Sequence, residues 1–114
     1  MPFIQVKTNA ALDAAKKLAV ENGLSDAISL IPGKSDRYLM VAVEDELSMM
    51  FHRDSESKMA MVEVKIFGSS TKSAYEKLTA AICETLEREA GIDGSCCYVK
   101  FEEVKYWGYD SFMF

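Results

Sequence analysis

Proline stands second in this chain, directly behind the initiator methionine. Removal of Met1 would leave Pro2 with a free secondary amine. A free amino terminus has a pKa of about 8, and burial in an apolar pocket lowers that pKa because the charged form loses solvation. Such an amine is a neutral base near neutral pH. Position alone favours a simpler interpretation, an ordinary Met-Pro start, so the rest of the chain has to supply a pocket around Pro2.

A cation and an aromatic residue are predicted to lie at the same end of the fold as Pro2. Lys34 lies in the loop that leads into the second predicted strand, and Tyr38 follows it. In a parallel strand–helix–strand unit both strands start at one end of the sheet, so Pro2, Lys34 and Tyr38 should converge there. Phe67-Gly68 joins them if the third strand is antiparallel to the first. Taken alone, however, Lys34 is best explained as a solvated loop lysine.

The C-terminal tail is dense in aromatic residues and ends on one. Its aromatic side chains are Tyr106, Trp107, Tyr109, Phe112 and Phe114. A tail of this composition is expected to pack on the body of the chain or on a neighbouring subunit rather than stay in water. Composition leaves open whether these side chains wall a ligand pocket or hold an oligomer together.

The spacing of apolar residues predicts two strand–helix–strand units of similar length. Strands are expected at 3–6, 38–43, 59–67 and 96–102, and helices at 12–31 and 71–90. Asn22-Gly23 is a point where the first helix could kink or break. Right-handed crossovers make the strands of each unit parallel. The predicted fold is α/β (α+β), a four-stranded mixed sheet with two helices on one face, in a single domain over 1–114.

Two helices cover only one face of such a sheet. The strands nevertheless carry apolar residues at both alternation phases, as in 39–43 and 59–66. No sequence remains to cover the second face, so other subunits are the economical answer, and a homo-oligomer is predicted. The short apolar run Met49-Met50-Phe51 fits a core or a subunit interface better than a ligand groove.

Composition argues against several functional classes. Of the 114 residues 49% are hydrophobic and 27% charged, with a net charge of −5 and no Lys/Arg cluster, which disfavours nucleic acid and anionic membrane surfaces as partners. Without a long apolar run or a signal peptide, a cytoplasmic location is expected. The cysteines Cys83, Cys96 and Cys97 form no disulfide framework, and the lone His52 completes no metal site. Neither a metal nor a cofactor is expected.

Several short motifs together resemble the macrophage migration inhibitory factor family of the tautomerase superfamily, along the whole chain. They are Met1-Pro2-Phe3-Ile4 with Thr8-Asn9, Gly33-Lys34 ahead of Tyr38, Val62-Glu63-Val64-Lys65 leading to Phe67-Gly68, Gly91-Ile92 ahead of Tyr98-Val99, and Trp107-Gly108 before Phe114. None is specific singly, but an N-terminal proline, a Gly-Lys and a Trp-Gly tail at these separations are specific in combination.

The resemblance implies a role for each matching position. Pro2, after loss of Met1, matches the catalytic base, and Lys34 matches the cation that meets the substrate carboxylate. Phe67 matches a position that binds substrate through its backbone N–H. The resemblance assigns the pocket walls to Tyr38, Trp107 and Phe114, and contributions from the neighbouring subunit to Tyr98 and Lys100. Members form trimers in which three sheets surround a central channel, which would cover the open sheet face.

The chain departs from the family pattern at positions that bear on the pocket. Ile66-Phe67-Gly68 replaces Ser-Ile-Gly, which narrows the expected pocket mouth. Lys100 stands where many members have Asn, adding a second cation near Lys34. Tyr109 replaces a tryptophan after Gly108. No Cys-x-x-Cys occurs, so the thiol-oxidoreductase activity attributed to some members has no basis here.

The resemblance therefore predicts a cofactor-independent isomerase of the phenylpyruvate tautomerase type. Pro2 would move a proton at the carbon next to the carbonyl of an α-keto acid, and Lys34 would hold the carboxylate. Two alternatives stay open. One is a cytokine-like ligand, secreted without a signal peptide, that binds a host receptor and has vestigial tautomerase activity. The other is a structural trimer without a ligand.

Overall fold

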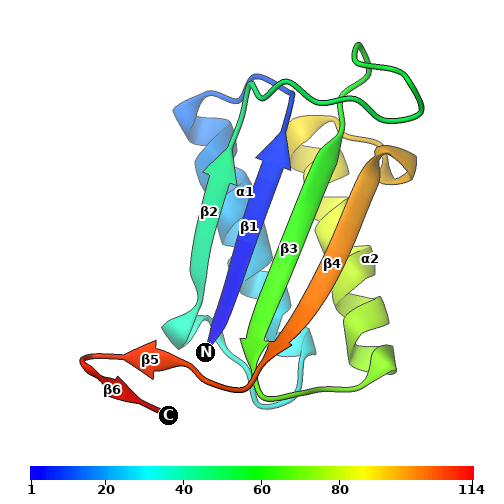
Figure 1. Ribbon diagram of the computed structural model, residues 1–114. Coiled ribbons are helices and arrows are strands. Elements are labelled where there is room, and N and C mark those ends of the chain that lie inside the picture. The colour runs from blue at the N-terminus through cyan, green and yellow to red at the C-terminus, as the bar shows by residue number, and fades with distance from the viewer.

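The body of the chain is a four-stranded sheet with both long helices on one face, as the computed structural model of residues 1–114 shows (Figure 1). The strands are β1 (Pro2–Thr8), β2 (Met40–Glu44), β3 (Ala60–Phe67) and β4 (Cys97–Val104), and their order in the sheet is β2-β1-β3-β4. Strands β1 and β2 are parallel, β3 and β4 are parallel, and β1 and β3 are antiparallel. The predicted architecture and strand directions are confirmed.

The helices are shorter than the hydrophobic pattern predicts. They are α1 (Ala14–Ala27) and α2 (Lys72–Ala90), with single 3₁₀ turns η1 (Ile28–Leu30), η2 (Asp36–Tyr38) and η3 (Gly94–Cys96). Helix α1 begins where the Asp13 side chain accepts the Lys16 N–H at 2.8 Å. Residue Tyr38 lies in η2, so the second strand begins two residues later than predicted. None of the helices is long and apolar enough to cross a membrane.

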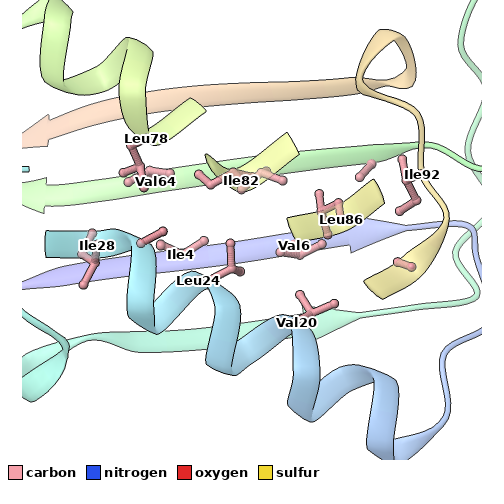
Figure 2. Close-up of a cluster of buried hydrophobic side chains, with 14 of the residues drawn as sticks. Ile4, Val6, Val20, Leu24, Ile28, Val64, Leu78, Ile82, Leu86 and Ile92 are labelled. Atoms are coloured by element: carbon pink, nitrogen blue, oxygen red, sulfur yellow. The ribbon is translucent and has the colours of Figure 1, made fainter. Parts of the chain in front are cut away.

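The core lies between the helices and one face of the sheet. Strands β1 and β3 alternate strictly between buried and half-buried residues, which directs one side chain in two toward the helices. Figure 2 shows the core side chains meeting between these layers, among them Ile4, Val6, Val20, Leu24, Ile28, Val64, Leu78, Ile82, Leu86 and Ile92. Each fully buried aliphatic side chain stabilises the fold by about 1.5–3 kcal/mol.

Gly23 does not interrupt α1, contrary to the kink or break that Asn22-Gly23 suggested. The helix runs unbroken through it, and a Cβ placed on Gly23 would lie 2.6 Å from Cγ2 of Thr85 on α2. A glycine at this position therefore lets the two helices approach closely. Thr85 cannot easily turn away, because it is β-branched and its Oγ1 donates to the Ala81 carbonyl at 2.8 Å.

We expect Gly23→Ala to lower the free energy of unfolding by about 1–2 kcal/mol, although alanine is the better helix former. Urea denaturation measures the loss. The matched background is Thr85→Ser, which removes Cγ2 and keeps the hydroxyl. In that background Gly23→Ala should cost less than about 0.5 kcal/mol. An equal cost in both backgrounds would show that the contact with Thr85 is not the cause.

Most of the second face of the sheet is uncovered by this chain, with Phe51 packed on Tyr98 at one end, and the face is not the apolar surface that the sequence suggested. Its centre is polar: Lys100 Nζ lies 3.6 Å from Glu63 Oε1 and 3.1 Å from Glu102 Oε1. Lys65 Nζ lies 3.4 Å from Glu63 Oε2. In 39–43 and 59–66, alternate residues face the helices and belong to the core. The residues between them lie on the second face, where apolar and charged side chains are mixed. The apolar argument for an oligomer therefore applies only to the ends of this face.

Candidate active site

The N-terminal end of β1 opens into a cleft of about 690 Å³. Its walls come from the start of β1, from η2 and β2, and from the segment that leads into a C-terminal hairpin. They consist of Met1, Pro2, Phe3, Arg37, Tyr38, Leu39, Met40, Trp107, Gly108 and Tyr109. Figure 1 shows the amino terminus lying beside that hairpin, β5 (Gly108–Tyr109) and β6 (Phe112–Met113). The volume of the cleft and its mainly apolar lining are typical of a site that binds a small molecule.

Pro2 is buried at the floor of this cleft, in register with Ile66 of β3. The residue ahead of it is also fixed, since the Phe67 N–H donates to the Met1 carbonyl oxygen at 3.0 Å. Met1 thus occupies the N–H that the resemblance assigns to substrate binding. Without Met1, that N–H would lose its partner at the edge of the cleft nearest Pro2.

Lys34 lies next to the amino terminus. Gly33 adopts φ 81°, a left-handed conformation that favours glycine, and the chain turns there so that Lys34 N–H donates to the Ile31 carbonyl at 3.0 Å. The Lys34 Nζ donates to the Phe67 carbonyl at 2.9 Å. Because the terminal amine is partly buried and Lys34 is close, the pKa of the Met1 amine is lowered, first by desolvation and then by the lysine charge and a hydrogen bond with it.

Aromatic rings connect the tail to the site. The Tyr38 ring meets Tyr109 edge-on with centroids 5.7 Å apart, and Phe114 lies 6.3 Å from Tyr109 and 6.1 Å from Phe67. The Phe114 N–H donates to the Trp107 carbonyl at 2.9 Å, which holds the end of the chain against the hairpin. Composition left open whether the tail lines a ligand pocket or holds an oligomer together. In the structure, Trp107, Gly108 and Tyr109 of the tail line the cleft at Pro2.

The family model for macrophage migration inhibitory factor (MIF) matches residues 1–110 of the chain. The chain belongs to the MIF family. It matches none of the curated protein sequences compared with it.

Solved structures of MIF proteins superimpose on the whole chain. Leishmania major MIF2 gives a TM-score of 0.93 at 24% identity, covering 100% of this chain and 97% of that one. The MIF-like protein of Entamoeba histolytica gives 0.86 at 27% identity, covering 99% and 98%. A structure described as "Q0 fused 4-OT wild type symmetric trimer" gives 0.79 at 20% identity, covering 90% and 85%. The fold is thus shared with MIF proteins and with a wider set of tautomerase-superfamily members, some of them trimers.

Two residues that the MIF resemblance assigns to the pocket lie far from Pro2 in the same subunit. On β4, Tyr98 is in register with Met61 and Lys100 with Glu63, whereas Pro2 is in register with Ile66 at the other end of the sheet. Tyr98 instead packs on Phe51 with ring centroids 4.9 Å apart, beside a small apolar pocket of about 160 Å³. Only the site of another copy is open to them, and that contribution stays a prediction.

The pairing of Lys100 changes what it can add to such a site. Its two carboxylate partners, Glu63 and Glu102, raise the pKa of Lys100, first through the hydrogen bond with Glu102. The positive charge of Lys100 is therefore offset by the negative charges of Glu63 and Glu102 beside it. The second cation near Lys34 that the resemblance implies would come from the Lys100 of another copy, and it stays a prediction.

Of the ten residues in the cleft wall, the sequence assigned Pro2, Tyr38 and Trp107 to the site. The predicted residues Lys34, Phe67 and Phe114 lie beside the cleft rather than in its wall. Among the wall residues that the sequence did not assign, Arg37 and Tyr109 carry polar groups. The signal for Arg37 was its place directly before Tyr38, within the single turn that carries that ring into the cleft. Tyr109 was noted only as a departure from the family pattern, and its contact with Tyr38 depends on a hairpin that the sequence did not reveal.

Proposed function

We propose that this MIF-family protein is a cofactor-independent tautomerase of α-keto acids such as phenylpyruvate, with the Pro2 amine as base once Met1 is removed. The observation that carries the proposal is that Pro2 lies buried in the wall of an apolar cleft, at the end of the chain where the Lys34 ammonium lies. Partial burial and the Lys34 charge lower the pKa of the Met1 amine, and a Pro2 amine freed by loss of Met1 would lie one residue along in the same surroundings. Lowering of its pKa favours the neutral form, which accepts a proton, and the cleft has the size of a small-molecule site.

In the proposed reaction the Pro2 nitrogen takes a proton from the carbon between the carbonyl and the ring of the keto acid. The C–H electron pair becomes the enol double bond while the C=O π pair moves to the oxygen, which takes the proton from the protonated Pro2 amine and so regenerates the neutral base; the reverse transfers regenerate the ketone. The Lys34 ammonium and the Phe67 N–H, freed of the Met1 carbonyl, bind the carboxylate. Lys34 also stabilises the negative charge that develops on the enolate. Tyr38, Trp107 and Phe114 surround the ring and exclude water.

The proposal is tested with protein whose intact mass shows that Met1 is gone. Interconversion of the enol and keto forms of phenylpyruvate is followed by ultraviolet absorbance, with and without the protein. We expect turnover above the uncatalysed rate, with an acidic limb in the pH profile of kcat/KM that lies below the ordinary amine pKa of about 8. No turnover by the processed protein would reject the proposal and favour the receptor-ligand hypothesis.

Lys34→Gln should raise the pKa of the terminal amine, because the neighbouring positive charge that disfavours the protonated form is removed. We expect the acidic limb of kcat/KM to move to higher pH and kcat/KM to fall about 10- to 100-fold, as loss of a charged hydrogen bond to the carboxylate predicts. Lys16→Gln is the matched control, since Lys16 is exposed on α1. If the acidic limb of kcat/KM does not move in Lys34→Gln, the charge of Lys34 does not affect the pKa of the catalytic base.

We further propose that the protein acts as a homotrimer in which Tyr98 and Lys100 of one copy complete the site of the next. Support comes from their distance from Pro2 along the sheet, from the sheet face left open by this chain, and from the relative described as a symmetric trimer. Light scattering after size-exclusion chromatography gives the mass in solution. A monomer with full turnover would exclude a contribution from a neighbouring copy.

A further inference from the structure

Arg37 is the only Lys, Arg, Asp or Glu side chain in the wall of the cleft at Pro2. Its guanidinium makes no ion pair and no hydrogen bond within the chain. The guanidinium lies over the ring of Tyr38, whose centroid is 5.3 Å from Cζ. This distinguishes Arg37 from Lys34, which already donates to the Phe67 carbonyl, and from Lys100, which is paired with Glu63 and Glu102.

The backbone of Arg37 and the ring beneath it are both held. Its N–H donates to the Ser35 hydroxyl at 3.4 Å, at the start of the η2 turn. The Tyr38 ring is fixed in turn by its edge-on contact with Tyr109. A guanidinium that lies over an aromatic ring uses its flat face for that contact, and its N–H donors at the edge remain free for an anion. Carboxylates are the anions that its fork geometry fits best.

The cleft therefore has two separate sites for negative charge. Lys34 and the Phe67 N–H, which lie beside Met1, are already assigned to the carboxylate next to the keto group in the proposed function, on which this inference rests. Arg37 lies in the η2 turn, which forms another part of the cleft wall, next to Tyr38. We propose that Arg37 is a specificity-determining residue that selects α-keto acids carrying a second carboxylate at the end remote from the keto group.

Pairs of acids that differ only in the remote carboxylate test this inference. The pairs are 4-carboxyphenylpyruvate with phenylpyruvate, and 2-oxoadipate with 2-oxohexanoate, which cover two lengths. Catalysed exchange of the hydrogens next to the carbonyl is measured in deuterium oxide by proton NMR, an assay that serves all four acids. For protein without Met1, the ratio of kcat/KM within at least one pair should favour the dicarboxylate.

In Arg37→Gln that ratio should fall about fivefold to tenfold, the effect of one charged hydrogen bond at a partly exposed site. Arg37→Lys should keep part of the preference, and added salt should reduce it in the unsubstituted protein. Arg53→Gln, an exposed arginine outside the cleft, should leave the ratio unchanged. A ratio that does not change in Arg37→Gln for either pair overturns the inference while the proposed function stands.

A different result would mark the failure of the proposed function itself. If the processed protein exchanges none of the four acids, the tautomerase proposal is rejected. The role of Arg37 is then decided by calorimetric titration with the same acids. A fivefold to tenfold weaker Kd for the dicarboxylates in Arg37→Gln, without a matching change for the monocarboxylates, would support the anion site, and equal affinities would reject it.

Discussion

Pro2→Gly is expected to lower kcat/KM for phenylpyruvate by at least about 100-fold while leaving the protein folded. A general base contributes about 10²–10⁴-fold, and its effect depends on a nitrogen held in a fixed position. The pyrrolidine ring of Pro2 fixes φ and orients the amine at the start of β1, where the residue is buried against β3. Glycine would keep an amine but would lose the ring, the secondary nitrogen and the fixed backbone.

The stability of the Pro2→Gly protein is the necessary control. Loss of a small buried ring and added backbone freedom should cost about 1–2 kcal/mol, which a domain of ordinary stability tolerates. Intact mass has to show that Met1 is removed from both proteins, and thermal denaturation has to show that both are folded. Undiminished turnover by a folded, processed Pro2→Gly protein would mean that another group is the base.

The arrangement of the sheet could be predicted because it depends on patterns that a sequence displays. Strands β1 and β3 place one residue in two against the helices, and that alternation is visible as apolar residues such as Ile4, Val6, Val62 and Val64. Right-handed crossovers then fix which strands are parallel. The same rule predicts that Pro2, Lys34 and Tyr38 lie at one end of the sheet.

The polar character of the second sheet face was harder to predict, because a run of apolar residues does not reveal which side chains point to the helices and which to the opposite face. The pairing of Lys100 with Glu63 depends on the register of β4 against β3. Register is set by packing over the whole strand and not by the residues of one short segment. The sequence therefore shows the second cation, Lys100, but not the two carboxylates that it pairs with.

The C-terminal hairpin was missed for a different reason. Its turn residues, Asp110 and Ser111, have φ of 50° and 70°, the left-handed conformations that Asn-Gly or Asp-Gly pairs usually supply. Asp and Ser are common in turns of many kinds, but without a glycine the pair Asp110-Ser111 does not indicate this two-residue hairpin turn. The hairpin places Tyr109 against Tyr38, and consequently one wall of the cleft was not predictable from local pattern.

Retention of Met1 is expected to reduce turnover by more than about 1,000-fold, a larger effect than that of Pro2→Gly. In the retained form the Pro2 nitrogen is a tertiary amide, which is not basic. The Met1 carbonyl also accepts the Phe67 N–H at 3.0 Å, the donor that the proposed mechanism gives to the substrate carboxylate. Retention of Met1 therefore removes both the basic Pro2 amine and the Phe67 N–H that would bind the carboxylate. Protein that retains Met1 is prepared by expression with an inhibitor of methionine aminopeptidase.

A specific rival makes this comparison decisive. The Met1 amine is itself partly buried beside Lys34, and its pKa is lowered, so it could act as the base one residue earlier. It lies about 3.3 Å further along the strand direction, however, and a displacement of even about 1 Å costs on the order of 100-fold. Treatment of the retained form with purified aminopeptidase should restore turnover in step with the loss of methionine mass. Equal turnover before and after treatment would show that either terminal amine, of Met1 or of Pro2, can act as the base. Reactivity would then depend on the surroundings at Lys34 and not on the proline ring.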